Sequence, residues 1–161
     1  MKQIVISKLE KSHIKEAIKL VEPLHETMVN KRQDVFLGIE EDWEKYFEER
    51  LQNNEWVMLV ATVENAVAGV CTAQVKRCGD DVQTKARTIL FVDYIAVNPK
   101  NRRNKVGTKL LDEVKRVAKD SNFQTVELNV WGFNKTAIEF YNSNDMKPKR
   151  IVYEYLIDKE K

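Results

Sequence analysis

A turn rich in cations stands between an apolar run and an amphipathic helix in the middle of the chain. The apolar run ends at Pro99, and Arg102, Arg103 and Lys105 follow before the helix pattern begins. Such a turn directs free backbone N–H groups and the positive end of a helix dipole toward one point, which favours phosphates. Taken alone, it also fits an ordinary strand-to-helix connection with solvated cations. The phosphate interpretation predicts a phosphorylated cofactor.

The residues that form a pattern in this stretch are Val97, Pro99, Arg102, Lys105, Gly107, Leu110 and Leu111. They resemble the cofactor motif of the GCN5-related N-acetyltransferases (GNAT superfamily), a family that binds acetyl-CoA. The family pattern is Arg/Gln-x-x-Gly-x-Gly/Ala. Lys105 stands in this chain where the first glycine is usual.

A second pattern lies further along the chain and comprises Asn134, Ala137, Phe140, Tyr141, Asp145 and Met146. It is similar to the later cofactor-and-acid motif of the same family, and Asp145 replaces a glycine that is usual there. The two motifs occur in the family order, about a helix and a strand apart. The resemblance therefore covers nearly the whole chain.

The resemblance implies an α/β (α+β) fold with a mixed, mostly antiparallel central sheet. The sheet is expected to splay between its fourth and fifth strands, with about four helices flanking it. Periodicity agrees with this order and predicts helices near residues 14–24, 43–51, 106–120 and 135–143. Strands are predicted at residues 4–6, 56–63, 67–75, 88–97, 125–130 and 151–157.

Three local features refine this prediction. Ser12 is expected to cap the first helix. The sequence Glu64-Asn65-Ala66 indicates a hairpin between two strands, and residues 78–85 indicate a polar loop before the next strand.

Length and composition predict one N-acetyltransferase domain over residues 1–161. With 43% hydrophobic residues, a chain of 161 residues can bury a single core without disulfides or metals. The 27 basic and 25 acidic residues leave a net charge of +2, which argues against nucleic acid as a partner. We therefore expect no metal and no polyanionic partner.

Several patterns point to the cytoplasm. No apolar segment approaches the length of a membrane span, and the N-terminus lacks the features of a signal peptide. Cys71 and Cys78 are expected to be reduced, and neither has a ligand partner at metal spacing. A membrane partner is not expected, and a homodimer is considered as an assembly state.

The resemblance assigns the donor site residue by residue. Backbone groups of the strand 95–97 are expected to pair with the pantetheine arm, and one N–H there is suited to an oxyanion. The basic turn and the helix N-terminus are expected to hold the pyrophosphate. The expected cofactor-binding residues are Ile95, Ala96, Val97, Arg102, Arg103, Asn104, Lys105, Val106, Gly107, Thr108, Asn129, Asn134 and Tyr141.

Tyr141 is the candidate catalytic acid. By itself, a tyrosine beside Phe140 on an amphipathic helix is typical of a half-buried packing residue. The resemblance instead places its hydroxyl at the thioester sulfur. The expelled thiolate has a pKa of roughly 8–9, so a phenol of pKa about 10 can hydrogen-bond to it or protonate it. Asn134 is expected to cap this helix and to contact the cofactor arm.

Asp93 is the candidate base, because a protonated amine cannot attack a thioester. It lies on the strand that leads to Val97, where the family often carries an acidic residue. Asp is shorter than Glu, which favours a water relay. An exposed carboxylate at a strand edge is the alternative interpretation.

The sequence thus predicts an acetyl-CoA-dependent N-acetyltransferase that acetylates a primary amine of a small molecule or peptide by direct attack, without a covalent enzyme intermediate. The main alternative is a degenerate module that binds CoA or a protein partner without turnover, because Lys105 and Asp145 replace glycines. A general nucleotide-binding protein is a third interpretation, although no glycine-lysine phosphate loop is present. The acceptor is expected to be chosen by residues 28–42 and 146–150, which carry no recognisable motif.

Overall fold

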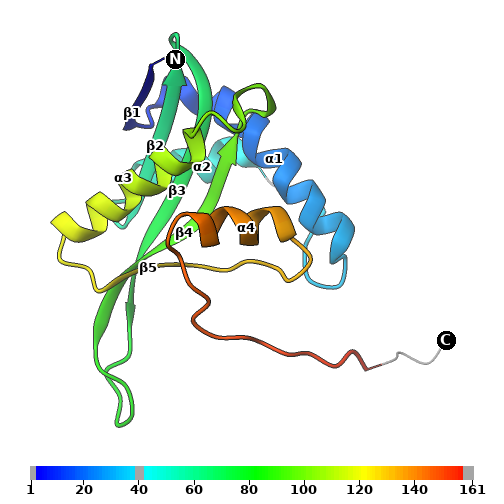
Figure 1. The fold of residues 1–161 in the computed structure, drawn as a ribbon, viewed down its shortest axis with the longest axis vertical. Helices are drawn as coiled ribbons and strands as arrows, with labels where there is room; N and C mark the ends of the chain where they lie inside the picture. Colours follow the sequence, from blue (N-terminus) through cyan, green and yellow to red (C-terminus); the bar gives the residue numbers. More distant parts are fainter. Residues whose placement is uncertain (1–2, 39–41, 158–161) are drawn as a thin grey trace. The chain divides into compact units, whose positions relative to one another are not determined.

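The structure is a computed structural model that describes residues 3–38 and 42–157 (Figure 1). The chain divides into two compact units, of which the first ends at Asn129 and the second begins at Val130. The first unit contains the central sheet and three of the helices. The second contains one helix and the C-terminal segment.

The sheet of the first unit has five strands in the order β1-β2-β3-β4-β5. Every neighbouring pair is antiparallel except β4 and β5, which run parallel. Glu64 and Asn65 turn the chain from β2 into β3 with φ of 51° and 65°, the positive values that tight hairpins require. The strands are β1 (Ile4–Lys8), β2 (Trp56–Val63), β3 (Ala66–Cys78), β4 (Arg87–Val97) and β5 (Thr125–Leu128).

Helices cover both faces of this sheet. The helices α1 (Ile14–Lys31) and α2 (Trp43–Leu51) share one core cluster with the sheet, which includes Val21, Phe47 and Val70. On the other face, α3 (Val106–Asp120) packs through Leu110 and Val114 against a second cluster. Short 3₁₀ turns precede α1 and α3, as η1 (Lys11–His13) and η2 (Pro99–Asn101). The second unit holds α4 (Lys135–Ser143).

The expected class, a mixed and mostly antiparallel sheet with four α-helices, is therefore confirmed for the part of the chain that the structure describes. Ser12 was expected as the cap of α1 but lies inside η1, and His13 occupies the N-cap position. The third strand extends to Cys78 and the fourth begins at Arg87, so the polar loop is shifted by one residue, to 79–86. The fifth strand ends at Leu128, two residues earlier than expected.

The predicted last strand, residues 151–157, is wrong for the single chain. No strand, helix or turn is formed between residues 146 and 157. The sequence there has strand character, but a strand also needs a neighbouring strand with which its N–H and C=O groups form hydrogen bonds.

Candidate functional site

Asp93 is the extra residue of a bulge in β4. In the antiparallel pair, Thr72 of β3 lies opposite Tyr94, and Ala73 lies opposite Val92, so Asp93 has no counterpart. The buried hydroxyl of Thr72 accepts a hydrogen bond from the Tyr94 N–H at 3.2 Å. A bulge turns a side chain away from the regular alternation of a strand. Here it presents the Asp93 carboxylate at an exposed position.

Tyr46 of α2 holds one oxygen of this carboxylate. Its hydroxyl donates a hydrogen bond of 2.5 Å to Asp93 Oδ2, and it lies 3.4 Å from the Thr72 hydroxyl. Burial, followed by the nearby charge of Asp93, raises the pKa of Tyr46 above its ordinary value, so the phenol remains a donor. Within the described residues, Asp93 accepts no hydrogen bond at Oδ1. The arrangement fixes one oxygen and leaves the other for a ligand.

The position of Tyr46 follows from the way α2 forms. The Asp42 side chain accepts a hydrogen bond from the Lys45 N–H at 3.0 Å and caps the helix. The buried face of α2 then carries Trp43, Tyr46 and Phe47 against the sheet. The Arg50 guanidinium stacks over the Tyr46 ring, with its carbon atom 3.5 Å from the ring centre.

Sequence reasoning missed the roles of Tyr46 and Thr72. Tyr46 lies on the apolar face of its helix, which accounts for its burial, since only 8% of it is exposed. Nothing in the local sequence indicates that its hydroxyl meets a carboxylate 47 positions away.

The strand β4 loses its β5 neighbour at the same place. The parallel pairing runs from Ile89 with Thr125 to Val92 with Leu128 and stops there. From Ile95 to Val97, β4 continues to pair with β3 on its other side. In the described part of the chain, the β5 side of residues 93–97 therefore has no strand partner, which confirms the expected splay. Backbone groups on that edge can pair with an extended ligand.

The turn after β4 brings two residues into the left-handed backbone region. Arg103 has φ of 63°, and Lys105 has φ of 62° with ψ of 14°. Lys105 is the N-cap residue of α3, and its side chain makes no capping hydrogen bond within the described chain. The N–H groups of the first helical turn, at Val106, Gly107 and Thr108, lack the i−4 acceptors that interior residues have. They are suited to an anion.

Gly69 of β3 allows α3 to begin so close to the sheet. A Cβ atom on Gly69 would lie 2.9 Å from Val106 Cγ1 and 3.0 Å from the carbonyl oxygen of Ala96. It would also lie 3.1 Å from Leu110 Cδ1. A glycine at this position therefore holds the N-terminus of α3 against the end of β4.

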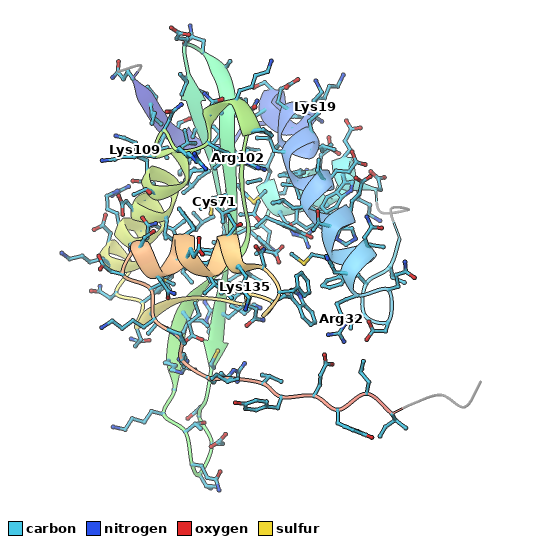
Figure 2. All side chains as sticks on the ribbon, turned by 45° about the vertical axis from the view of Figure 1, so that its right-hand side comes forward. Lys19, Arg32, Cys71, Arg102, Lys109 and Lys135 are labelled. Atoms are coloured by element: carbon cyan, nitrogen blue, oxygen red, sulfur yellow. The ribbon has the colours of Figure 1, made fainter. Side chains whose placement is uncertain are left out.

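The turn is positively charged and open to solvent. Arg102, Arg103 and Lys105 are all exposed, and none of them takes part in an ion pair within the described residues. The first turn of α3 contains no acidic residue. Figure 2 shows Arg102 at the beginning of α3. These cations are therefore available to an anionic ligand.

In the second unit, α4 carries the residues of the later motif. The Asn134 side chain accepts a hydrogen bond from the Ala137 N–H at 3.1 Å, which confirms the predicted cap. Tyr141 is half-buried, and its ring meets that of Phe140 edge to face with 5.1 Å between centroids. Asn129, the remaining expected contact, is exposed just after β5 in the first unit.

Asp145 occupies the position that ends α4. Its φ is 61°, and the Met146 N–H donates to the Tyr141 carbonyl at 3.0 Å. This is the Schellman arrangement, in which glycine is preferred because the backbone is left-handed. A glycine at this position therefore serves to end the helix. Its replacement by Asp145 puts a residue with a Cβ atom into the left-handed backbone conformation.

The environment of Cys71 does not suit a nucleophile. Cys71 is fully buried, and burial together with the charge of Asp93 raises the pKa of its thiol to about 12.

No three His, Cys, Asp or Glu side chains are grouped to hold a metal ion in residues 3–38 and 42–157. In the same ranges, no helix is both long and apolar enough to span a bilayer.

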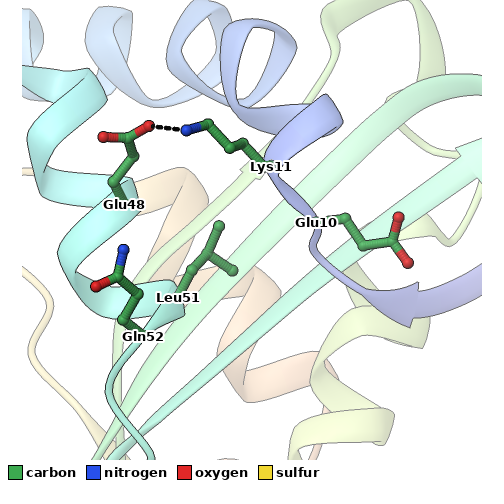
Figure 3. A pocket seen from close by; sticks show the side chains of 5 residues that line it. All are labelled: Glu10, Lys11, Glu48, Leu51 and Gln52. Atoms are coloured by element: carbon green, nitrogen blue, oxygen red, sulfur yellow. Dashed lines mark ion pairs between the residues drawn. The ribbon is translucent and has the colours of Figure 1, made fainter.

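A hollow of about 350 Å³ lies between η1 and α2 (Figure 3). Among its lining residues, the Lys11 ammonium pairs with the Glu48 carboxylate at 2.8 Å. It is lined by Glu10, Lys11, Glu48, Leu51 and Gln52. None of the expected site residues contributes to it.

Part of the expected acceptor region is formed by the end of α1 and the residues after it. Leu37 lies there, and its carbonyl oxygen is 3.2 Å from His25 Nε2. Residues 39–41, which belong to the segment expected to choose the acceptor, lie outside the described residues. Residues 146–150, the other such segment, form no helix or strand.

Comparison with solved structures identifies similar folds at low sequence identity. A point mutant of the BH1408 protein from Bacillus halodurans is 20% identical, with a TM-score of 0.89 over 95% of this chain and 99% of that one. The aminoglycoside N-acetyltransferase AAC(6')-Iy, solved in complex with CoA, is 16% identical, with a TM-score of 0.76 over 98% and 96% of the two chains.

A third similar structure is the aminoglycoside acetyltransferase meta-AAC0020 from an uncultured soil metagenomic sample, in complex with sisomicin. It is 18% identical, with a TM-score of 0.69 over 97% of each chain. No curated protein sequence matches this chain. The model of the acetyltransferase (GNAT) family matches residues 23–145, which include the first motif and the second as far as Asp145. The chain therefore belongs to the GNAT acetyltransferase family.

Proposed function

We propose that this chain is an N-acetyltransferase that uses acetyl-CoA as the acetyl donor and a primary amine as the acceptor. The observation that carries the proposal is the sequence of features along β4. An exposed carboxylate at a bulge is followed by a strand edge without a β5 partner and then by a cationic turn at a helix N-terminus. One active domain over residues 1–161 is part of the proposal.

The described residues fit the donor. The first-turn N–H groups of α3 and the exposed cations of the turn suit the pyrophosphate. The edge of β4 at Ile95, Ala96 and Val97 suits the amide-containing pantetheine arm. We propose the same donor role for Asn129 and Asn134. The complex of AAC(6')-Iy with CoA supports this choice of donor.

In this proposal Asp93 removes a proton from the acceptor amine, directly or through a water molecule. Tyr46 is bound to Oδ2 and orients the carboxylate, so Oδ1 is left to face the amine. The neutral amine nitrogen then attacks the thioester carbonyl carbon, the carbon–sulfur bond breaks, and the nitrogen releases its second proton to solvent as the amide forms. The N-acetyl product keeps the acetyl group, and the sulfur departs as a thiolate.

We assign Tyr141 the role of stabilising or protonating that thiolate. A phenol is acidic enough to donate a hydrogen bond to a thiolate and weak enough to be protonated beforehand at neutral pH. No covalent enzyme intermediate is included. The high pKa and full burial of Cys71 support this omission.

The acceptor is proposed to be a small-molecule amine or a peptide amine. The aminoglycoside complexes of similar structures support a small polyamine-like acceptor as the first class to test. Neither nucleic acid nor a membrane is proposed as a partner, and the cytoplasm is the proposed location.

A free-thiol assay tests this proposal. Purified protein is mixed with acetyl-CoA and a panel of primary amines, and release of CoA is followed with a thiol reagent. A thermal-shift series with acetyl-CoA, ATP and NAD accompanies the assay. Stabilisation by acetyl-CoA without amine-dependent thiol release would support the non-catalytic alternative. Stabilisation by ATP or NAD in place of acetyl-CoA would support a general nucleotide-binding protein.

A further inference from the structure

His25 is a buried histidine that the mechanism above does not use. It lies on the buried face of α1, together with Ala17 and Val21, and only 8% of it is exposed. Buried polar groups are generally hydrogen-bonded, because an unpaired one loses its contact with water without compensation. The partners of its two ring nitrogens therefore indicate the role of this histidine.

Each ring nitrogen of His25 meets a different part of the chain. Nε2 lies 3.2 Å from the carbonyl oxygen of Leu37, in the segment after α1. Nδ1 lies 3.4 Å from the hydroxyl of Tyr94, which follows Asp93 in β4. A carbonyl oxygen can only accept a hydrogen bond, so in the neutral ring Nε2 carries the proton and Nδ1 accepts from the tyrosine. One imidazole thereby joins the segment after α1 to the strand of the proposed base.

Two aromatic rings pack against the imidazole. The Phe36 ring meets it edge to face with 6.0 Å between centroids, and the Trp43 ring does so at 5.4 Å. Phe36 belongs to the segment after α1, and Trp43 is the first residue of α2. Such contacts favour one orientation of a buried ring. The direction of the Nε2–H bond is therefore set by the core of the protein.

The segment after α1 begins as a turn. The Phe36 N–H donates to the Arg32 carbonyl at 3.0 Å. The Arg32 guanidinium, labelled in Figure 2, binds the two carboxylate oxygens of Asp34 at 2.7 and 2.8 Å. These bonds lie within the turn, whereas the bond from His25 to Leu37 ties the turn to the protein core.

Leu37 combines a fixed main chain with an exposed side chain. Its carbonyl oxygen is held by His25, yet 87% of the residue is exposed. Isolated exposed leucines are common on proteins. This one is distinguished by the residue that holds it, because the same imidazole contacts β4 next to Asp93. Its side chain offers apolar contact area to the carbon skeleton of an amine.

We propose that His25 is a positioning residue for the amine acceptor, because it fixes Leu37 relative to the strand that carries Asp93. Leu37 then contacts the carbon skeleton of the amine while Asp93 removes a proton from its nitrogen. His25 itself touches neither acetyl-CoA nor the amine. This role rests on the proposed acetyl transfer and adds a residue that determines how tightly the acceptor binds.

Two substitutions separate the ring nitrogens of His25. A glutamine amide reaches about as far as Nε2 and can still donate to the Leu37 carbonyl, whereas an asparagine amide reaches only about as far as Nδ1. His25→Asn should raise the KM of the amine about two- to tenfold, the usual worth of one hydrogen bond. Its kcat and its Kd for acetyl-CoA should stay close to the wild-type values. His25→Gln should restore most of the amine KM.

Two further variants complete the kinetic test. His13→Asn changes the other histidine of the chain and is the matched control, because an asparagine can still accept from the Glu10 N–H that His13 Nδ1 binds at 3.0 Å. All of its constants should equal those of the wild type. Leu37→Ala, at an exposed position that should tolerate the change, should raise the amine KM severalfold and tests the proposal even if His25→Asn fails to fold.

Nitrogen NMR of the histidine rings tests the geometry whatever the activity. The neutral His25 ring should be protonated at Nε2, and the Phe36 amide should exchange faster with solvent in His25→Asn. Protonation at Nδ1 would overturn the role of His25. An unchanged amine KM in His25→Asn or Leu37→Ala would do the same, as would a His25→Gln variant no better than His25→Asn.

The kinetic results also separate this role from other outcomes. If His25→Asn lowered kcat and donor affinity as much as it raised the amine KM, His25 would be a structural residue of the core and the proposal would be wrong. A wild type that released no thiol with any amine would overturn the proposed acetyl transfer, and the role of His25 with it. Normal wild-type turnover with an unchanged His25→Asn would overturn the role of His25 alone.

Discussion

Lys105 has a backbone conformation that favours glycine. Replacing it tests both the strain in that backbone and the contribution of its charge to donor binding. Its φ of 62° lies in the left-handed region, where a residue with a Cβ atom is strained by about 1–2 kcal/mol. Glycine relieves that strain but loses about 0.4–1 kcal/mol through the entropy of the unfolded chain. Lys105→Gly should therefore be roughly 0.5–1 kcal/mol more stable than Lys105→Ala.

Lys105→Ala is the matched control because it removes the same charge and keeps the Cβ atom. Both variants also lose the repulsion between a cation and the N-terminus of α3, which contributes about 0.3–1 kcal/mol. Urea unfolding of the three proteins separates these effects. Equal stabilities of Lys105→Gly and Lys105→Ala would refute the backbone argument.

The second role of Lys105 concerns the donor. The lysine is exposed and has no ion pair among the described residues, so a neighbouring phosphate would gain roughly 0.5–1 kcal/mol from it. Lys105→Ala should then weaken acetyl-CoA binding about two- to fivefold. Lys105→Glu should weaken it more, and binding to the wild type should decrease with salt.

Lys105→Gly should bind with only a mild loss, since closer approach of the backbone offsets the missing charge. Isothermal titration with acetyl-CoA measures all four proteins. If Lys105→Gly bound far more tightly than the wild type, the lysine would be an obstruction. The non-catalytic alternative would then gain support.

Four further predictions address the remaining residues. Tyr141→Phe should lower turnover roughly 10²–10⁴-fold with little change in donor affinity; near-normal turnover would remove Tyr141 from the mechanism. The rate should rise from acidic to mildly alkaline pH, and Asp93→Asn should flatten that rise; an unchanged pH profile would place the base elsewhere. Asp145→Gly should stabilise the fold by about 0.5–1 kcal/mol in urea unfolding, and Asp145→Ala should not; a less stable glycine variant would contradict the helix-termination argument. Because the pKa of Cys71 is raised to about 12, iodoacetamide at pH 8 should modify Cys78 and spare Cys71 until urea is added; alkylation of Cys71 in the folded protein would argue against its burial.

The sequence was most informative where the signal was local. Asp42 before an amphipathic run, Asn134 before another and the pair Glu64-Asn65 each indicate a structure that neighbouring residues determine by themselves. The structure has a helix, a helix and a hairpin at these places.

The bulge at Asp93 depends on the neighbouring strand β3. The residues around Asp93 alone could not predict it. It exists because Thr72 lies opposite Tyr94 and satisfies its N–H, and because the Tyr46 hydroxyl approaches from α2. These contacts join segments more than 20 positions apart, which periodicity does not reveal.

The segment 151–157 illustrates the opposite case. Its local pattern is that of a strand, and the prediction is wrong for the single chain because the segment pairs with no described strand. For Lys105, the substitution of a glycine was visible in the sequence, but the left-handed backbone became visible only with the fold.

Release of CoA from acetyl-CoA in the presence of primary amines tests the central claim most directly. The rate of thiol release should depend on both the protein and an amine, and mass spectrometry should find one acetyl group on the amine for each CoA released. The claim would be contradicted if acetyl-CoA saturated the protein and no amine in a panel of polyamines, aminoglycosides, amino acids and peptides raised thiol release above the rate with water.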